Sequence, residues 1–440
     1  MHSHAEIARA LAGAFLASAL DSREGSRRAR RLFGQRYAWL PPLADRVAAQ
    51  FAGQTPPRQV AVAEFIRRDR GFRRACERHE LEIVDPLMEK PCASAIRASA
   101  DWGLPDIRTA GELSAWLGIR DEELAWFADL RRLEFKQGRG RLSHYHYRIV
   151  SKRFGTVRLL EAPKPRLKSL QRQILADLLD RVPPHEAAHG FRRGRSIKTF
   201  ALPHVGQDTV LRIDLENFFP SLRTARVEAL FRALGYPERV ADLLAGLCTN
   251  SAPLEVWDRA SPPMALERIR DTRWSYAQPH LPQGAPTSPA LANLCAFRLD
   301  CRLARLAQAA GATYTRYADD LAFSGGRGFA RAVNRFRHHV AATASEEGFA
   351  VNYRKTRIMR QGVCQRLAGV VVNSRLNVGR MEYDRLKALL TNCLRRGAAS
   401  QNRAGHKDFR AHLLGRISFV EMVNTTRGAK LRAIFDRIDW

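Results

Sequence analysis

The chain has 440 residues, of which 45% are hydrophobic, and this length allows two or three domains with a large core. Its net charge of +29 favours a polyanionic partner, usually nucleic acid; the basic residues are spread along the whole chain, which argues against a membrane-binding helix. Seven cysteines without C-x-x-C spacing argue against a disulfide framework or a zinc ribbon and indicate the reducing cytoplasm. No apolar run is long enough to span a bilayer, so no membrane partner is expected.

Residues 1–135 are expected to form a basic helical domain. Two of its segments, "SREGSRRARRLFGQR" and "FIRRDRGFRR", are dense in arginine. Such segments are either solvated helix faces or phosphate-binding surfaces, and both explanations remain open at this point. The glycine- and arginine-rich stretch "KQGRGRLSHYHY" follows and marks a domain boundary.

From Tyr147 onward, short β-rich runs alternate with helices, which predicts an α+β fold. The run "RIVSKRFGTVRLLEAP" predicts a hairpin that turns at Phe154–Gly155, and "LKSLQRQILADLLDRV" has helical spacing of apolar residues. The run "TVLRIDLENFFPSL" predicts a strand that leads into a turn or helix. After "GVVVNSRLNVG" the chain returns to basic helices up to Trp440.

Three aspartates lie in or beside apolar strands, where carboxylates are costly to bury. Asp214 ends the strand "LRIDLENFF", and Asp319 and Asp320 lie in "RYADDLAFSGG". If both segments are neighbouring strands of one sheet, Asp214 and Asp319 meet at one end of it, and Mg²⁺ is needed to relieve their repulsion. Two such ions suit nucleotidyl transfer, because they clamp the attacking and leaving oxygens of phosphoryl displacement. Strand residues alternate between faces, so Asp319 is the expected bridging ligand and Asp320 need not do equal work.

The motifs "LRIDLENFFPSL", "LPQGAPTSPALANL", "RYADDLAFSG" and "NYRKTRIM" resemble, in this order, the palm of reverse transcriptases. The segments "HGFRRGRSIKTFA" and "RLLEAPKPRLKSLQRQIL" resemble the fingers, and "CQRLAGVVVNSR" resembles the hairpin that seats the primer terminus. The similarity covers about residues 145–435, and "LPQGAPTSP" with "YADD" is most similar to bacterial retron enzymes. It implies a right-hand polymerase with a helical N-terminal domain (1–135), fingers and an antiparallel palm sheet (145–365), and a primer-grip hairpin with a helical thumb (366–440).

The resemblance also assigns site residues. Asp214, Asp319 and Asp320 match the catalytic metal ligands, with Leu215 beside them, and two Mg²⁺ ions are the expected cofactor. Phe219 matches the steric gate that excludes a ribose 2′-hydroxyl; the alternative is a core aromatic residue, which its neighbour Phe218 is expected to be.

The other residues expected to bind nucleotide are spread over three segments. Gln283 matches a residue that lines the nucleotide pocket, and Lys152 and Arg158 resemble residues that grip the triphosphate. Lys355 is a candidate proton donor to pyrophosphate, and an ordinary surface lysine is the alternative.

These resemblances imply an RNA-directed DNA polymerase. A retron enzyme would copy part of a cognate structured noncoding RNA from a 2′-hydroxyl of that RNA, giving a branched RNA–DNA product with a role in anti-phage defence. Its partners would be that RNA, its DNA copy and dNTPs, with an effector protein as a further candidate. The alternative is another stand-alone bacterial reverse transcriptase, group II intron-like or defence-associated, with a different template and priming mode.

Two rivals come from other classes. "HEAAH" at residues 185–189 matches the H-E-x-x-H pattern of zinc proteases, but Pro183–Pro184 and Gly190 leave little room for the helix that this pattern needs. An inactive RNA-binding relic of a polymerase is disfavoured because it would be free to lose the three aspartates, and all are present.

Overall fold

The computed structural model of the chain describes residues 3–16, 20–51, 57–84, 101–133, 143–151, 157–259 and 266–440. The chain divides into two compact units. The first unit comprises Met1–Pro183 and Phe219–Cys295, and the second comprises Pro184–Phe218 and Ala296–Trp440. No helix among the described residues is long and apolar enough to cross a membrane. The three predicted domain ranges remain predictions beside this division.

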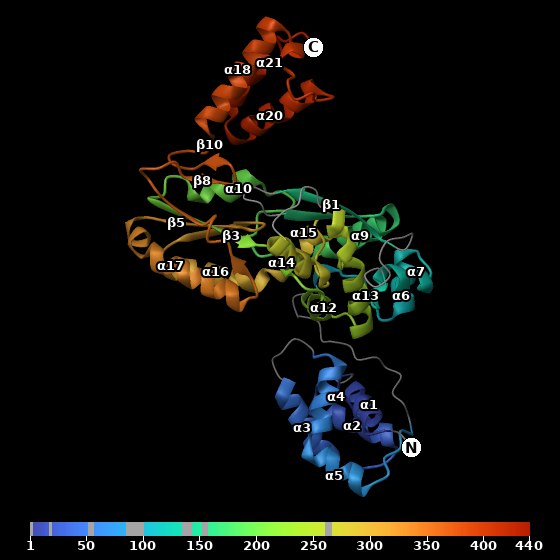
Figure 1. Cartoon of the computed structure of the whole chain (residues 1–440). Helices are drawn as coiled ribbons and strands as arrows, with labels where there is room; N and C mark the ends of the chain where they lie inside the picture. Colours follow the sequence, from blue (N-terminus) through green and yellow to red (C-terminus); the bar gives the residue numbers. More distant parts are fainter. Residues whose placement is uncertain are drawn as a thin grey trace. The chain divides into compact units, whose positions relative to one another are not determined.

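The N-terminal part of the first unit is helical, as expected, and its helices share one core (Figure 1). The amphipathic helices turn apolar side chains such as Phe33 and Phe72 inward and most arginines of α2 and α5 outward. Asp21 and Asp69 cap the N-termini of α2 and α5 by accepting backbone N–H bonds. The helices are α1 (His4–Leu16), α2 (Ser22–Phe33), α3 (Leu40–Phe51), α4 (Gln59–Arg68) and α5 (Arg70–Arg78).

The rest of the first unit combines a hairpin with helices. Strands β1 and β2 pair antiparallel with Tyr145 opposite Pro163, which confirms the predicted hairpin; its turn and Lys152 lie outside the described residues. The elements are α6 (Ala110–Leu117), α7 (Asp121–Ala128), β1 (Tyr145–Ser151), β2 (Val157–Pro163), α9 (Pro165–Asp177), η3 (Leu179–Arg181), α12 (Thr224–Ala233), α13 (Glu238–Cys248), η5 (Leu254–Arg259), α14 (Leu266–Ala277) and α15 (Ser288–Cys295).

An antiparallel sheet forms the centre of the second unit, as the palm prediction requires. Its strand order is β4-β5-β3-β6, and β7 also pairs with β3, so the strand that follows Asp319 lies between two others. Helices α16 (Phe297–Ala309) and α17 (Arg327–Glu346) pack beside the sheet (Figure 1). The strands are β3 (Thr209–Glu216), β4 (Thr313–Tyr317), β5 (Asp320–Gly325), β6 (Ala350–Val351) and β7 (Arg357–Arg360).

The C-terminal part of the second unit begins with a small antiparallel sheet, as expected for "CQRLAGVVVNSR", and ends in helices. One hydrophobic core joins Val210 and Ala322 of the central sheet to Leu390, Ile417 and Leu431 of these helices. The elements of the second unit not yet named are α10 (Ile197–Ala201), η4 (Leu202–His204), β8 (Arg366–Leu367), β9 (Val370–Val371), β10 (Asn377–Val378), α18 (Arg380–Arg396), α19 (Ala398–Gln401), α20 (Phe409–Val423) and α21 (Thr425–Phe435).

Candidate active site

The three predicted aspartates meet where β3 ends and β5 begins. Asp214 lies directly opposite Asp320 in the antiparallel register. Asp319 occupies the tight connection between β4 and β5, and its carbonyl oxygen accepts the N–H of Leu215 at 2.9 Å. Leu215 itself pairs with Val351 of β6, and its side chain is buried. The sheet therefore fixes all three acidic residues through its backbone pairing.

Asp320 is bound by an arginine of the neighbouring strand. Arg212 lies two residues before Asp214 on β3, and its Nε and Nη2 donate to Oδ1 and Oδ2 of Asp320 at 2.9 and 3.0 Å. Burial nevertheless raises the pKa of Asp320, and Arg212 offsets this only in part. Among the residues that the structure describes, no three His, Cys, Asp or Glu side chains are arranged to hold one metal ion.

Asp214 has a different counter-ion, from the loop between β6 and β7. The ammonium Nζ of Lys355 lies 2.9 Å from each carboxylate oxygen of Asp214. The Lys355 side chain is half exposed whereas the Asp214 carboxylate is almost completely buried. This contact places Lys355 in the acidic cluster, and its role as a proton donor to pyrophosphate stays a prediction.

Asp319 carries the unrelieved negative charge of the cluster. Burial raises its pKa, and the nearby carboxylates of Asp214 and Asp320 raise it further, while Lys355 opposes them. A carboxylate that is desolvated beside two others is a site that gains from a cation. The carboxylates of Asp214 and Asp319 lie at the same end of the sheet. Their oxygens are the hard ligands that Mg²⁺ prefers, so these residues fit a divalent ion.

A buried ion pair supports the connection that carries Asp319. Arg316, which is completely buried, donates from Nε and Nη2 to the Asp300 carboxylate at 2.8 and 2.6 Å, and Tyr314 donates its hydroxyl to the same group. The Nη1 of Arg316 donates to the carbonyl of Ala318 at 3.2 Å, and Ala318 has a positive φ of 56°. A Cβ on Gly190 would lie 2.6 Å from the Ala318 nitrogen, so the neighbouring chain can approach only as glycine.

This support was not found in the sequence. Arg316 precedes "YADD" in an apolar strand, which was the available signal, but its partner Asp300 lies on α16 and nothing in the sequence pattern points to it.

The two aromatic residues after β3 differ in burial. Phe218 is buried and stacks on Phe349, with ring centroids 5.7 Å apart, which confirms it as a core residue. Phe219 is only half buried, and it lies two residues after Asn217, which has a positive φ. Partial exposure suits a side chain that has to meet a ligand better than one that only fills the core.

Two predicted nucleotide-binding residues lie on adjoining segments of the first unit. Arg158 is exposed on β2, and Gln283 lies in the loop before α15. The Gln283 carbonyl accepts the N–H of Glu161 at 2.8 Å, and its side-chain Oε1 is buried with no hydrogen-bond partner among the described residues. An unsatisfied buried acceptor is costly, so a bound donor at this position is favoured.

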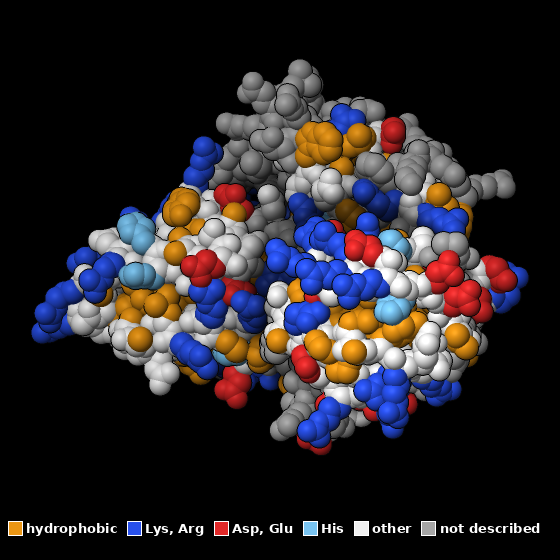
Figure 2. Space-filling model, turned by 90° about the horizontal axis from the view of Figure 1, so that it is seen from below, with side chains coloured by type: hydrophobic (Ala, Val, Ile, Leu, Met, Phe, Trp, Pro, Cys, Tyr) orange, Lys and Arg blue, Asp and Glu red, His pale blue; other side chains and the backbone are white. Residues whose placement is uncertain are grey.

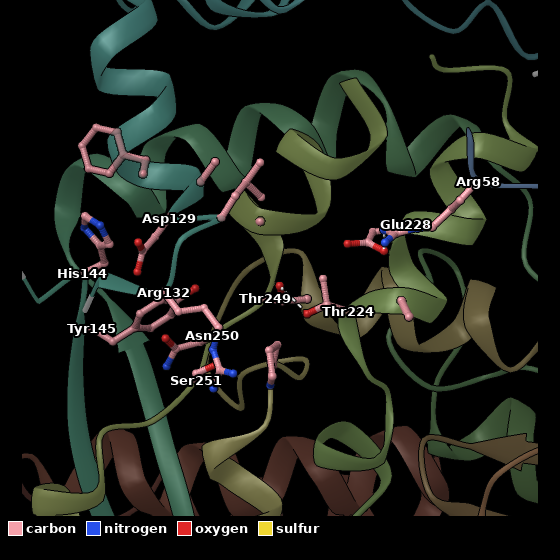
Figure 3. Close-up of a pocket in the computed structure, with 16 residues that line it drawn as sticks. Arg58, Asp129, Arg132, His144, Tyr145, Thr224, Glu228, Thr249, Asn250 and Ser251 are labelled. Atoms are coloured by element: carbon pink, nitrogen blue, oxygen red, sulfur yellow. Dashed lines mark hydrogen bonds and ion pairs between the residues drawn. The ribbon is translucent and has the colours of Figure 1, made fainter. Parts of the chain in front are cut away.

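A separate pocket of about 310 Å³ lies in the first unit, and none of the predicted site residues lines it. Figure 3 shows polar side chains around it, including Thr224, whose hydroxyl donates to Thr249 at 2.9 Å. Asn250 belongs to its wall and also donates to the buried carboxylate of Glu161 at 2.8 Å.

The zinc-protease alternative is wrong. Residues 185–189 form no helix, so His185 and His189 are not presented on one helical face. Burial, reinforced by the positive charges of Arg195 and Arg192, lowers the pKa of His189 to about 4, and its Nδ1 bonds the Thr199 hydroxyl at 2.9 Å. The segment instead packs against the palm strand, where the His189 N–H donates to the carbonyl of Arg316.

Known proteins share these features. The family profile of the reverse transcriptases (RNA-dependent DNA polymerases) matches residues 150–387. The retron Mx65 reverse transcriptase of Myxococcus xanthus is 44% identical over 76% of this chain and 72% of that protein. The retron Mx162 reverse transcriptase of the same organism is 36% identical over 76% of this chain and 67% of that protein. The retron Ec86 reverse transcriptase of Escherichia coli is 28% identical over 64% of this chain and 77% of that protein.

The matched residues include β3 with Asp214, β5 with Asp320, the connection with Asp319 and the loop with Gln283. The predicted α+β polymerase fold and the predicted RNA-directed DNA polymerase activity are thereby confirmed. The chain belongs to the reverse transcriptases and, within them, is of the bacterial retron type.

Proposed function

We propose that this polymerase copies part of a cognate structured noncoding RNA into single-stranded DNA, and that it starts from a 2′-hydroxyl of the same RNA. The product is a branched RNA–DNA molecule that serves anti-phage defence in the cytoplasm. Its similarity to retron reverse transcriptases supports this proposal. The partners are then the RNA, its DNA copy, dNTPs and an effector protein.

The charge distribution supports an extended nucleic-acid surface. The chain carries a net charge of +29. On the face shown in Figure 2, lysine and arginine side chains gather in groups, and acidic side chains lie beside several of them. Phosphates neutralised by such groups release counterions, which makes binding strong and dependent on salt.

The observation that carries the catalytic proposal is the desolvated carboxylate pair Asp214 and Asp319 at the end of β3. These two residues hold the divalent ions, which we propose to be two Mg²⁺, with Leu215 at the same strand end and Asp320 held by Arg212. A divalent ion held by these residues would supply Lewis-acid chemistry: it would favour loss of the proton from the attacking hydroxyl and would offset the charge that develops on the phosphate oxygens.

The chain's own residues position the reactants. The primer hydroxyl oxygen forms a bond to the α-phosphorus of the dNTP, and the bond from that phosphorus to the bridging oxygen of pyrophosphate breaks. Arg158 and Gln283 bind the incoming nucleotide, together with Lys152, and the Phe219 ring excludes a ribose 2′-hydroxyl. Lys355, whose ammonium already lies in the acidic cluster, supplies a proton to the departing pyrophosphate.

The test is to express the chain with its neighbouring noncoding genomic sequence and to sequence the nucleic acid that co-purifies. Treatment with a debranching enzyme should release the DNA from one internal 2′-linked nucleotide of a single RNA species. Asp214→Ala and Asp319→Ala should abolish this DNA and primer extension while the thermal melt and RNA binding persist. Substantial synthesis by either folded variant would refute the assignment of the metal site, and an unbranched DNA would refute the priming mode.

A further inference from the structure

A carboxylate lies among the apolar side chains on the inward face of β2, the second strand of the fingers hairpin. Along β2 the buried positions alternate with exposed ones, and Val157, Leu159 and Glu161 all face inward. Val157 and Leu159 belong to a hydrophobic cluster with Tyr276, whereas Glu161 is completely buried beside them. Burying a carboxylate is costly unless its oxygens are paired, so its partners have to explain why it is there.

Glu161 is paired on both oxygens by residues from two distant segments. The Asn250 amide donates to Oε1 at 2.8 Å and also bonds the Tyr147 hydroxyl at 3.1 Å. The imidazole Nε2 of His280 lies 2.9 Å from Oε2, and His280 is also completely buried. Asn250 and His280 are further joined by two backbone hydrogen bonds of 2.9 and 3.0 Å.

The protons of this junction can be counted. The Nδ1 of His280 lies 2.7 Å from the carbonyl of Gln278, which can only accept, so Nδ1 carries a proton. A second proton then lies between His280 Nε2 and Glu161 Oε2. Whichever atom holds it, the pair is neutral as a whole and every polar contact is satisfied, which makes the junction stable and directional in a dry environment.

The same glutamate braces the loop that contains Gln283 through its backbone. The Glu161 N–H donates to the Gln283 carbonyl at 2.8 Å. A Cβ on Gly284, whose φ is +137°, would lie 2.8 Å from the Glu161 carbonyl oxygen, so only glycine permits the approach. His280 lies three residues before Gln283, and Arg158 lies three residues before Glu161 on the opposite, exposed face of β2.

We propose that Glu161, His280 and Asn250 form a positioning junction that fixes the loop bearing Gln283 against the strand bearing Arg158 and thereby sets the affinity for dNTP. The three residues need not touch the nucleotide; they hold the two segments that do. This inference rests on the proposed role of Arg158 and Gln283 in nucleotide binding. An apolar residue at position 161 would pack equally well on the inward face of β2. The bonds of Glu161 to Asn250 and His280 therefore point to a positioning role and not to simple packing.

The experiment uses the full-length protein on a primer–template whose primer ends in a dideoxynucleotide, with the next complementary dNTP as the probe. Affinity is read from the dNTP dependence of ternary-complex stability, and KM and kcat are measured on an extendable primer. Glu161→Leu keeps the inward row apolar but cuts both side-chain links. It should weaken dNTP binding by about ten- to a hundredfold, since small misplacements of positioning groups have effects of this size.

Matched variants separate positioning from stability. Glu161→Gln keeps an acceptor for Asn250 and offers an amide donor to His280, so it should restore most of the affinity. Leu159→Ala, on the same buried row, should lower the melting temperature but leave dNTP affinity near that of the wild type. If Glu161→Leu does not fold, His280→Leu cuts the link from the loop side and should raise the KM for dNTP more than it lowers kcat.

The outcomes distinguish an error in the role of the junction from an error in the proposed nucleotide-binding residues. If Glu161→Leu, or His280→Leu in its place, folds and binds dNTP like the wild type while Gln283→Ala binds it weakly, the junction is structural only and the inference is wrong. If Gln283→Ala also binds dNTP normally, the proposed nucleotide-binding residues are wrong. Loss of affinity in Leu159→Ala equal to that in Glu161→Leu would likewise overturn the inference, because general loosening of the hairpin would then explain both.

Discussion

Replacing Arg316 by methionine should destabilise the protein by about 3–5 kcal/mol, because it leaves the Asp300 carboxylate buried without its counter-ion. Both side chains are completely buried, and the guanidinium makes two hydrogen bonds to Asp300 and a third to the Ala318 carbonyl. Methionine fills a similar length and replaces none of these bonds. In a folding unit of 150–250 residues each kcal/mol is worth about 2–4 °C, so the unfolding midpoint should fall by roughly 6–20 °C.

The assay is thermal unfolding of the purified full-length variant, followed by circular dichroism. Arg68→Met is the matched control, because Arg68 pairs with Glu64 while both side chains are largely exposed, and such a pair is worth only about 0.3–0.5 kcal/mol. The double variant Arg316→Met/Asp300→Leu removes the uncompensated charge and should be more stable than Arg316→Met alone. A midpoint for Arg316→Met close to that of the control, or a double variant less stable than the single one, would refute the reasoning.

Four further outcomes are expected. Phe219→Val should raise rNTP incorporation relative to dNTP in primer extension, and equal loss of both would indicate a packing role. Lys355→Ala should lower kcat by about a hundredfold or more if Lys355 is a general acid, with little change in melting temperature; unchanged kcat would leave it an ordinary lysine. Burial lowers the pKa of His204 from 6.5 to about 3, so only the unfolded chain gains this proton as pH falls below 6.5. The stability lost by pH 5 should be about 2 kcal/mol, and melting of His204→Gln should show a shallower decline with acidification. Deleting residues 1 to about 100 should weaken RNA binding and flatten its log–log salt dependence by several units, while a generic primed template is still extended; an unchanged slope would point to a protein partner for this domain.

The aspartates could be predicted from the sequence because the signal is local. A carboxylate inside an apolar, strand-like run is costly, and Asp214 and Asp319 each stand in such a run. The hairpin before Pro163 and the C-terminal helices could likewise be predicted, from the alternation of apolar and polar residues and from the helical spacing of apolar residues. Each of these features depends on residues close together in the chain.

The counter-ions could not be predicted, because they depend on register and on long-range packing. Arg212 meets Asp320 only because β3 and β5 pair with Asp214 opposite Asp320. Arg316 is one of 73 lysines and arginines, and although it lies in an apolar strand, nothing in the sequence identifies Asp300 as its partner. Glu161 gave a weak sequence signal, because it is a charged residue at an inward-facing position of the strand "VRLLEAP". Its partners Asn250 and His280 lie far away in the chain and could not be identified.

The counter-ions also explain why the adjacent aspartates can do unequal work. Arg212 grips both oxygens of Asp320 with a rigid fork, whereas Lys355 meets Asp214 as a point charge on a flexible, half-exposed stem. An ammonium of that kind can swing away when a divalent ion arrives, but a bidentate guanidinium on a strand is much harder to displace. Among the described residues, no arginine or lysine is hydrogen-bonded to the Asp319 side chain, and both neighbouring carboxylates add to the burial that raises its pKa, so a cation should stabilise Asp319 most. We therefore propose that Asp214 and Asp319 are more open to a metal ion than Asp320, the third predicted ligand, whose contact with Arg212 holds β5 against β3.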